Sequence, residues 1–291
     1  MRSTEITAVI PTIGRPSLRR AVSSVLRQTQ ATAPLVVLDD PDALGVVRRR
    51  LDGLGYGLVL TAGRQGAAAA RNLGARVAET PYVAFLDDDD EWLAEKSRLQ
   101  QSATEAETVV SSRAMLVGST SRIVPEQVYR SRTTAETLAD YVLDRSTIRL
   151  RRHFMQTSSL FCTRQAVIDV PWAEELPRHQ DWDWLIRLES AGISIRQRSD
   201  VLVRVFQGSQ GSISRSPDWQ ASRAWIESIE ERVSERAAGD FLASVVARGA
   251  FESRAWGEGA RTLLQSLRGG AHRSAVLVGM SGMMSRGVLR G

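Results

Sequence analysis

The sequence predicts an α/β protein, with a mostly parallel sheet flanked by helices and a helical extension at the C-terminal end. Three observations support this prediction. Short apolar runs alternate with helical patterns over residues 6–90, acidic residues follow two of those runs, and the chain is helical in pattern over 216–291. Such alternation is typical of a parallel sheet, whose ligands bind at the carboxyl ends of the strands.

The first strand and helix are marked by a β-branched run and by apolar spacing. Ile6 to Ile10 form a short apolar run that Pro11 stops, which is typical of a buried parallel strand. Residues 17–28 then carry apolar side chains at helical spacing, with Ser17 as a candidate N-cap. The chain therefore begins as strand, loop and helix.

The same alternation continues through the first third of the chain. Strands are predicted at 34–40, 57–63 and 82–90, and helices at 44–54 and 66–80. The carboxyl ends of parallel strands meet at one edge of a sheet. The acidic residues that follow the second and fourth strands are therefore expected at that edge.

The rest of the chain is less regular and then becomes helical. The further predicted elements are a helix at 94–107, a strand at 108–112, a strand and helix within 154–167, a helix at 182–192, strands at 193–206, and helices at 219–236, 238–252 and 255–267. A loop rich in Gly and Ser, residues 207–218, precedes the last three helices. We expect residues 1–215 to form one α/β domain and residues 216–291 a helical region.

Composition limits the class of protein. Hydrophobic residues make up 43% of the chain and charged residues 24%, which favours a folded core over disorder. The formal charge is +5, and Lys96 is the only lysine among the 38 basic residues. The arginines form no dense block and do not interleave with aromatic residues, so we expect them to be spread over the surface and expect no binding of nucleic acid.

Cysteine content and hydropathy bear on location. The lone Cys162 excludes an internal disulfide and fits a reducing compartment, where we expect it to be a buried structural thiol. No apolar run approaches the length of about 20 residues that spans a bilayer. We expect a cytoplasmic protein, with peripheral contact at the inner face of the membrane through its C-terminal region.

Four consecutive aspartates, Asp87 to Asp90, follow the fourth predicted strand. Like charges this close raise one another's pKa unless a cation lies among them. Mg²⁺ typically uses one or two protein carboxylates and completes its shell with water and phosphate oxygens. We therefore favour a divalent cation site over a helix cap, for which one aspartate is enough. If the strand continued, Asp87 and Asp89 would share one face.

A second pair of carboxylates, Asp181 and Asp183, flanks Trp182 at the start of a predicted helix. A carboxylate held there at the edge of a cleft can act as a base toward a hydroxyl. Capping of the helix by Asp181 is an equal alternative, and the role of the neighbouring His179 is equally open.

Taken in order, these motifs resemble the family 2 glycosyltransferases, which have the GT-A fold. The matching segments, spread over roughly residues 5–215, are "AVIPTIGRPSLRRAVSSVLRQT", "VVLDD", "GAAAARNLGARVAETPYVAFLDDDDEW", "TSSLFCTR" and "QDWDWLIRL". The resemblance implies an inverting enzyme that uses a nucleotide-diphosphate sugar, a UDP-sugar first among them. The acceptor would be a saccharide, a lipid-linked glycan or a small molecule, and the pathway glycan, polysaccharide or glycoconjugate biosynthesis.

The resemblance also implies roles for individual residues. The residues that would bind the donor are Pro11, Thr12, Arg15, Asp40, Arg71, Asn72, Asp87 and Asp88. Asp89 would be the ligand of Mn²⁺ or Mg²⁺, and Asp181 the general base. Ser158, Gln180 and Trp182 would lie on the acceptor side. Residues 1–110 would form the half that binds the nucleotide sugar, and 111–215 the half that binds the acceptor.

Two positions depart from the family pattern. Gln180 stands where the family usually has a glutamate, and Phe206 or Gln207 stands where many members have a histidine that joins the metal site. The missing negative charge beside Asp181 would lower the pKa of that base. The missing histidine leaves open whether the enzyme requires a metal.

Two other classes of function remain open. A nucleotidyltransferase usually has a basic, Gly-rich loop after the first strand, whereas "PTIGRPS" has one glycine and one arginine. A non-catalytic scaffold could keep the sheet and hold a partner or a membrane through the Arg-rich C-terminal helices, which carry Trp219, Trp225 and Trp256. Substitution of Asp89 and Asp181 would separate an enzyme from a scaffold, because only an enzyme would lose turnover.

Overall fold

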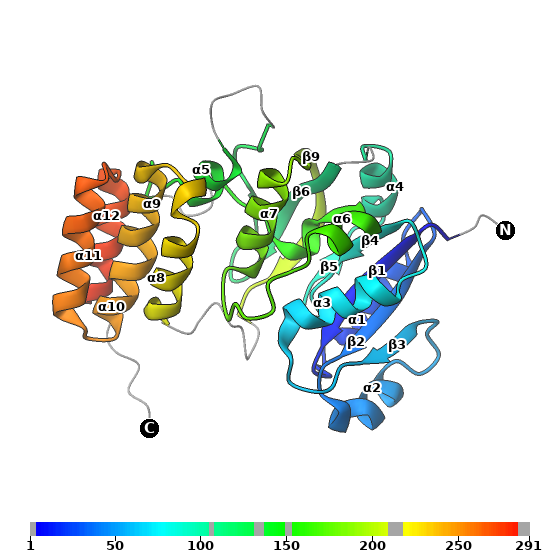
Figure 1. The fold of residues 1–291 in the computed structure, drawn as a ribbon. Coiled ribbons are helices and arrows are strands. Elements are labelled where there is room, and N and C mark those ends of the chain that lie inside the picture. The colour runs from blue at the N-terminus through cyan, green and yellow to red at the C-terminus, as the bar shows by residue number, and fades with distance from the viewer. Residues whose placement is uncertain (1–3, 105–107, 131–136, 149–152, 209–217, 285–291) are drawn as a thin grey trace. The chain divides into compact units, whose positions relative to one another are not determined.

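The computed structural model describes residues 4–104, 108–130, 137–148, 153–208 and 218–284 (Figure 1). The chain divides into two compact units. The first comprises Met1–Ser131, Phe154–Glu175 and Gln180–Gln210, and the second Arg132–His153, Leu176–His179 and Gly211–Gly291. Most of the predicted loop 207–218 lies outside the described residues. The domain boundary near residue 215 stays a prediction.

The first unit is built on one sheet, with the strand order β3-β2-β1-β4-β8-β6-β9-β5 and with β7 paired to β6. Its strands are β1 (Ile6–Thr12), β2 (Thr32–Leu38), β3 (Gly57–Leu60), β4 (Tyr82–Phe85), β5 (Glu91–Trp92), β6 (Thr108–Val117), β7 (Arg122–Val124), β8 (Phe161–Thr163) and β9 (Ser194–Phe206). The first four strands pair in parallel, as do β6 and β9, whereas β8 is antiparallel to both β4 and β6. The predicted α/β fold is confirmed, and antiparallel pairs enter where β8 joins.

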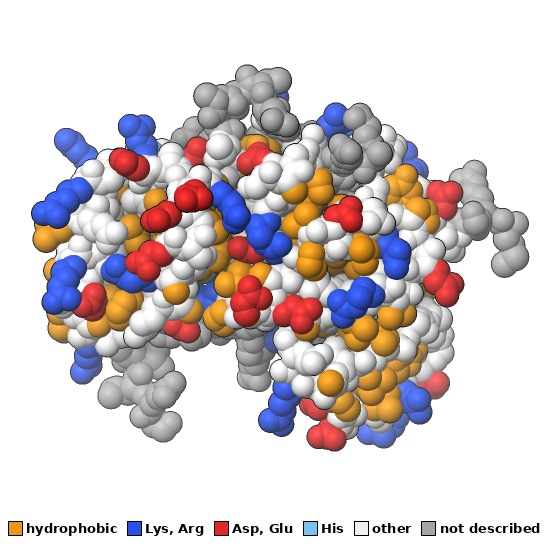
Figure 2. All heavy atoms as spheres, viewed as in Figure 1, with side chains coloured by type: hydrophobic (Ala, Val, Ile, Leu, Met, Phe, Trp, Pro, Cys, Tyr) orange, Lys and Arg blue, Asp and Glu red, His pale blue; other side chains and the backbone are white. Residues whose placement is uncertain are grey.

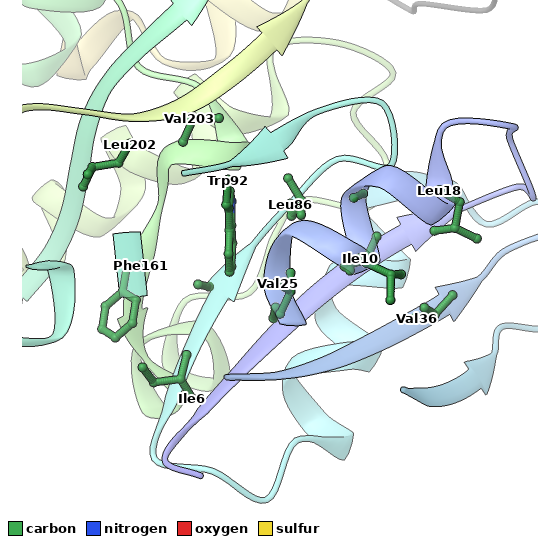
Figure 3. Packing of buried hydrophobic residues seen from close by; sticks show 14 of the residues in the cluster. Ile6, Ile10, Leu18, Val25, Val36, Leu86, Trp92, Phe161, Leu202 and Val203 are labelled. Atoms are coloured by element: carbon green, nitrogen blue, oxygen red, sulfur yellow. The ribbon is translucent and has the colours of Figure 1, made fainter. Parts of the chain in front are cut away.

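Helices cover both faces of the parallel strands. The helices of this unit are α1 (Leu18–Leu26), α2 (Leu44–Arg50), α3 (Gly66–Val77), α4 (Lys96–Gln101), α6 (Arg164–Asp169) and α7 (Gln180–Ser190). Ile6 and Ile10 of β1 share a buried cluster with Val25 of α1 (Figure 3). Val9 points to the other face, where α3 packs so closely that a Cβ on Gly74 would lie 2.4 Å from Val9 Cγ1. The alternation of side chains along β1 therefore supplies both layers of core.

Two of the strand ends that differ from the prediction bear on the site. β1 continues through Pro11 to Thr12, so the expected stop at Pro11 is wrong. β4 ends at Phe85, and the chain then turns, with Asp90 N donating to Asp87 O at 3.0 Å. The alternation of a strand therefore does not apply to Asp87 and Asp89.

The only lysine lies in the core. Lys96 is fully buried, with Nζ 4.0 Å from the centre of the Trp92 ring and 3.4 Å from Leu160 O. Burial lowers the pKa of Lys96 well below its usual value. Burial likewise raises the pKa of the Cys162 thiol, so Cys162 is a structural residue, as the sequence indicated.

The second unit is helical. Its helices are α5 (Leu138–Leu143), α8 (Trp219–Ser228), α9 (Glu235–Phe241), α10 (Arg248–Glu252), α11 (Trp256–Arg268) and α12 (Arg273–Met280). The π-helical segment Leu242–Ala247 joins α9 to α10, and Ser234 caps α9 by accepting from Ala237 N. The predicted start at Ala238 is therefore wrong. Trp225 packs inside this unit with its ring centre 5.2 Å from that of Phe241.

The distribution of surface charge and the length of the helices both bear on function. On the face drawn in Figure 2, basic and acidic side chains are interspersed and form no single basic field. Within the described residues, every helix is too short or too polar to cross a membrane.

Candidate active site

The carboxyl ends of β1 and β4 bring a hydroxyl, a guanidinium and carboxylates together. Thr12 Oγ1, at the end of β1, donates to Asp88 Oδ2 at 2.6 Å. Arg15 Nη1 donates to Asp88 Oδ1 at 3.2 Å and lies 3.6 Å from Asp89 Oδ2. Burial raises the pKa of Asp88 to about 6, although Thr12 and Arg15 oppose the shift. Three predicted donor residues, Thr12, Arg15 and Asp88, therefore meet at one place.

Arg71 of α3 connects the acidic run to the start of α7. Its Nη2 donates to Asp87 Oδ1 at 2.8 Å, and its Nη1 donates to Gln180 Oε1 at 3.2 Å. The guanidinium carbon lies 4.7 Å from the centre of the Trp172 ring. That ring stacks on Trp184 of α7 with centres 4.3 Å apart. One buried arginine therefore positions residues that are far apart in the sequence.

Asp181 lies in the first turn of α7, directly after Gln180. Trp182 N donates to its Oδ1 at 3.0 Å. Burial raises the pKa of Asp181 to about 6, and the positive charge of Arg71 opposes this shift. A carboxyl group with such a pKa is ionised at neutral pH and can still accept a proton from a reacting hydroxyl. Asp183 differs, because it is buried in an ion pair with Arg187 Nε at 2.7 Å.

Asp90 holds the acidic turn in place. Ser158 Oγ and Gln156 Nε2 donate to Asp90 Oδ2 at 2.6 and 2.9 Å, and Phe206 N donates to Oδ1 at 3.1 Å. Burial, followed by the charge of Asp87, raises the pKa of Asp90 well above its usual value. Ser158, predicted on the acceptor side, is fully buried, and its Oγ also accepts from Asp87 N at 3.0 Å. Gln156 was missed by the sequence analysis.

The two aspartates after β2 are held differently. Asp39 is buried and accepts from Thr61 Oγ1 at 2.5 Å and from Gln65 N and Gly66 N at 2.9 and 2.8 Å, so it fixes the start of α3. Sequence reasoning missed this role, although Asp39 precedes the predicted donor residue in the same motif. Asp40 is half-buried and accepts from Asp42 N at 3.2 Å in a short turn.

Asn72, predicted to bind the donor, is engaged elsewhere. Its amide donates to Trp172 O at 2.9 Å and Glu174 Oε1 at 2.7 Å, and it accepts from Trp172 N at 2.9 Å. These bonds fix the segment before α7. The donor role of Asn72 stays a prediction.

The acidic run fits a sparse cation site. Asp89 is half-buried, and Arg20 Nη2 donates to its backbone oxygen at 2.5 Å. Within the described residues, the run does not bring ligand atoms of three His, Cys, Asp or Glu side chains within 4.8 Å of one another. One or two carboxylates with water and phosphate oxygens are what Mg²⁺ ordinarily uses. Phe206 is one of the two candidate positions for the missing family histidine, and its ring centre lies 3.8 Å from the Arg20 guanidinium carbon.

Sequence comparisons point to one family. The profile described as Glycosyl transferase family 2 matches residues 7–170. The "Amylovoran biosynthesis glycosyltransferase AmsB" of Erwinia amylovora is 25% identical over 255 residues, which cover 81% of each chain. The "UDP-Glc:alpha-D-GlcNAc-diphosphoundecaprenol beta-1,3-glucosyltransferase WfgD" of Escherichia coli is 35% identical over 88 residues, or 30% of this chain and 35% of WfgD.

Solved structures agree on the fold. S. aureus TarS 1-349, in complex with UDP-GlcNAc, matches with a TM-score of 0.61 at 18% identity, over 91% of this chain and 80% of that one. The mannosyltransferase PcManGT from Pyrobaculum calidifontis, in complex with GDP-Man and Mn²⁺, gives a TM-score of 0.54 at 13% identity, over 100% of this chain and 77% of that one. A longer structure of S. aureus TarS is matched over 44% of its length. These likenesses confirm the expected GT-A fold.

Proposed function

Because this chain belongs to glycosyl transferase family 2 and is a glycosyltransferase, we propose that it transfers a sugar from a nucleotide-diphosphate donor to an acceptor hydroxyl, with inversion at the anomeric carbon. The observation that carries the proposal is the bridge made by Arg71. Its guanidinium contacts Asp87 at 2.8 Å and Gln180 at 3.2 Å, which joins the acidic turn to the helix that begins with Asp181.

In this proposal, the nucleotide-sugar donor binds at the edge of the sheet formed by the carboxyl ends of β1, β2 and β4. Arg15 and Arg71 already pair with the carboxylates of this edge, so positive and negative groups alternate there. Such an arrangement suits a diphosphate together with a divalent cation. The donor-binding residues would be Pro11, Thr12, Arg15, Asp40, Arg71, Asn72, Asp87 and Asp88. A UDP-sugar is the first candidate, because TarS is complexed with UDP-GlcNAc and the name of WfgD specifies UDP-Glc.

Asp89 would hold Mn²⁺ or Mg²⁺. When bound, the cation supplies positive charge that stabilises the departing diphosphate. Asp89 fits this role because Asp88 and Asp90 are buried and hydrogen-bonded to protein groups, whereas Asp89 is more open to solvent. Arg15, whose Nη1 lies 3.6 Å from Asp89 Oδ2, would be a second positive group beside the diphosphate.

Asp181 would be the general base. Its carboxylate takes the proton of the acceptor hydroxyl while the acceptor oxygen forms a bond to the anomeric carbon. The bond from that carbon to the diphosphate oxygen breaks on the opposite side, so the configuration inverts. Gln180, fixed by Arg71, holds the start of α7 in place. Trp182, half-buried beside the base, would offer an apolar surface to the acceptor.

The biological setting of the proposal is the synthesis of a polysaccharide or glycoconjugate. AmsB acts in amylovoran biosynthesis, and the name of WfgD specifies a lipid-linked substrate. We place residues 1–215 in the transferase domain and 216–291 in a helical region. The reaction would then occur in the cytoplasm, with contact to the inner face of the membrane through the helical region.

Nucleotide binding tests the proposal. The full chain is titrated calorimetrically with UDP, GDP, dTDP and CDP, with and without Mn²⁺ or Mg²⁺. We expect one nucleotide to bind more tightly with metal. The anomeric configuration of the transferred or hydrolysed sugar, followed by NMR, then tests inversion. Absence of binding to every nucleotide under both conditions would overturn the donor assignment.

A further inference from the structure

A second acidic cluster lies in the helical unit, apart from the residues proposed for catalysis. Asp144 follows α5, Asp240 lies in α9, and His272 precedes α12. One ligand atom from each of these side chains lies within 4.8 Å of the other two. Three segments that are distant in the sequence therefore bring two carboxylates and an imidazole together.

The spacing of these atoms is close to that around a tetrahedral ion. His272 Nδ1 lies 2.8 Å from Asp240 Oδ2 and 4.0 Å from Asp144 Oδ1. Ligand atoms bound at about 2.0–2.1 Å to tetrahedral Zn²⁺ lie about 3.3 Å from one another. Shifts of well under 1 Å per atom would therefore bring these atoms to that spacing.

A second histidine lies beside the cluster, in contact with Asp144. His153 is buried, with 6% of its side chain exposed, and its Nδ1 lies 3.3 Å from Asp144 Oδ2. His153 is not one of the three residues whose ligand atoms lie within 4.8 Å of one another. It therefore orients Asp144 from outside the ligand set, as the outer contacts of metal ligands do.

We propose that Asp144, Asp240 and His272 bind one Zn²⁺ ion, with water as the fourth ligand. Imidazole nitrogens together with carboxylate oxygens suit Zn²⁺, whereas Mg²⁺ prefers oxygen ligands alone. The two carboxylates offset the charge of the ion, and the positive charge of Arg145 acts on both of them. The ion replaces the contact between His272 Nδ1 and Asp240 Oδ2 and needs an unprotonated nitrogen, so its binding weakens at low pH.

The surrounding backbone holds the carboxylates in position. Arg145 N and His272 N donate to Asp240 Oδ2 and Oδ1 at 2.8 and 2.7 Å. Ser146 N and Oγ donate to Asp144 Oδ2 at 3.2 and 2.7 Å. The guanidinium of Arg145 donates to the backbone oxygen of Asp144 at 3.0 Å. Such outer contacts orient metal ligands, and the bound ion would link α5, α9 and α12.

Metal content and thermal unfolding test the proposal. The full chain, without a histidine tag and with Asp89→Ala to remove the other cation site, is stripped with a chelator and titrated with Zn²⁺. We expect one Zn²⁺ per chain by mass spectrometry and a higher Tm with Zn²⁺. His272→Gln and His153→Gln should each weaken Zn²⁺ binding by about 10-fold or more.

The third histidine of the chain gives a matched control. His179 belongs to the same unit but bonds to Ser222 Oγ at 2.9 Å and packs on Trp225. His179→Gln should keep the Zn²⁺ affinity. Unchanged binding in the double variant His153→Gln/His272→Gln, or no binding by the folded Asp89→Ala chain, would overturn the proposal. If the variants fail to fold, Co²⁺ is added to the Asp89→Ala chain in place of Zn²⁺, and the visible absorption of the bound Co²⁺ is measured. Strong visible absorption of a tetrahedral site supports the proposal, and weak octahedral absorption contradicts it.

Discussion

The acidic turn at Asp87–Asp90 and the cluster around Asp240 show two ways of keeping carboxylates in a fold. In the first, consecutive aspartates are contacted by the guanidinium groups of Arg15 and Arg71. In the second, dispersed aspartates are bonded by backbone amides and by His272. The arginines add positive charge to the first cluster, which suits an anionic ligand, whereas backbone bonds fix the carboxylates of the second cluster in one orientation. We infer that the first cluster serves turnover and the second serves structure.

The largest effect on turnover is expected from Asp181→Asn. The variant removes the proposed base at the end of the Arg71 bridge, and loss of general base catalysis typically lowers the rate by about 10²–10⁴-fold. Release of the nucleoside diphosphate from the donor, with acceptor present, measures kcat/KM. Asp52→Asn, at an exposed position after α2, is the matched control and should keep wild-type turnover. Near-normal activity of Asp181→Asn would overturn the role of Asp181 as the general base.

Asp89→Ala is expected to have a smaller effect, which is a loss of the gain in nucleotide affinity that the metal gives. The substitution removes the proposed cation ligand, so the gain in affinity that Mn²⁺ gives should fall by roughly 10-fold or more. Calorimetry with UDP and Mn²⁺ measures this gain. The metal-free affinity, to which Arg15 and Arg71 contribute, serves as the internal control. If Mn²⁺ enhances UDP binding equally in the variant, the cation lies elsewhere.

The pH profile gives a moderate and directional effect. A base must be deprotonated, so kcat/KM should rise with pH and reach half its maximum near pH 6, the pKa of Asp181. Gln180→Glu adds a negative charge beside the base, which should raise this midpoint by roughly 0.5–1 pH unit. Gln180→Ala, which adds no charge, is the control. A midpoint that stays fixed or moves down in Gln180→Glu would contradict the placement of Asp181 beside residue 180.

The smallest effect is expected from Asp88→Asn, on stability. Burial raises the pKa of Asp88 to about 6 in the folded protein, whereas in the unfolded chain this pKa is about 4. The stability that the neutral carboxyl contributes is therefore complete below about pH 4 and is lost as the pH rises through 6. Asn cannot ionise, and the variant should therefore gain roughly 2–4 °C in Tm at pH 8 relative to wild type, and less at pH 5. The scans are run with a chelator, and Asp42→Asn, at an exposed position, is the control. A Tm gain that is the same at both pH values would refute this effect of charge.

Sequence patterns located the parts of the catalytic edge because each part is local. The apolar run of β1 and the aspartates after β4 are recognisable from adjacent residues alone. What the sequence could not predict was the set of contacts between them. Burial raises the pKa of Asp88 and the bond from Thr12 opposes that shift, and the role of Gln156 depends on a bond to Asp90.

The second cluster was beyond sequence reasoning for the same reason. Asp144, Asp240 and His272 occupy unrelated segments, and none of them follows a recognisable motif. Their proximity results from the packing of three helices. Similarly, the sequence predicted a divalent cation for the acidic turn, but it did not predict that Arg15 and Arg71 would pair with the carboxylates of this turn.

Burial of Lys96 has a practical consequence. It is the only lysine of the chain, and its side chain is fully buried over Trp92. Amine-reactive dyes, cross-linkers and surface-coupling reagents therefore have no accessible ε-amino group in the folded protein. Reaction of Lys96 itself would report on opening of the core.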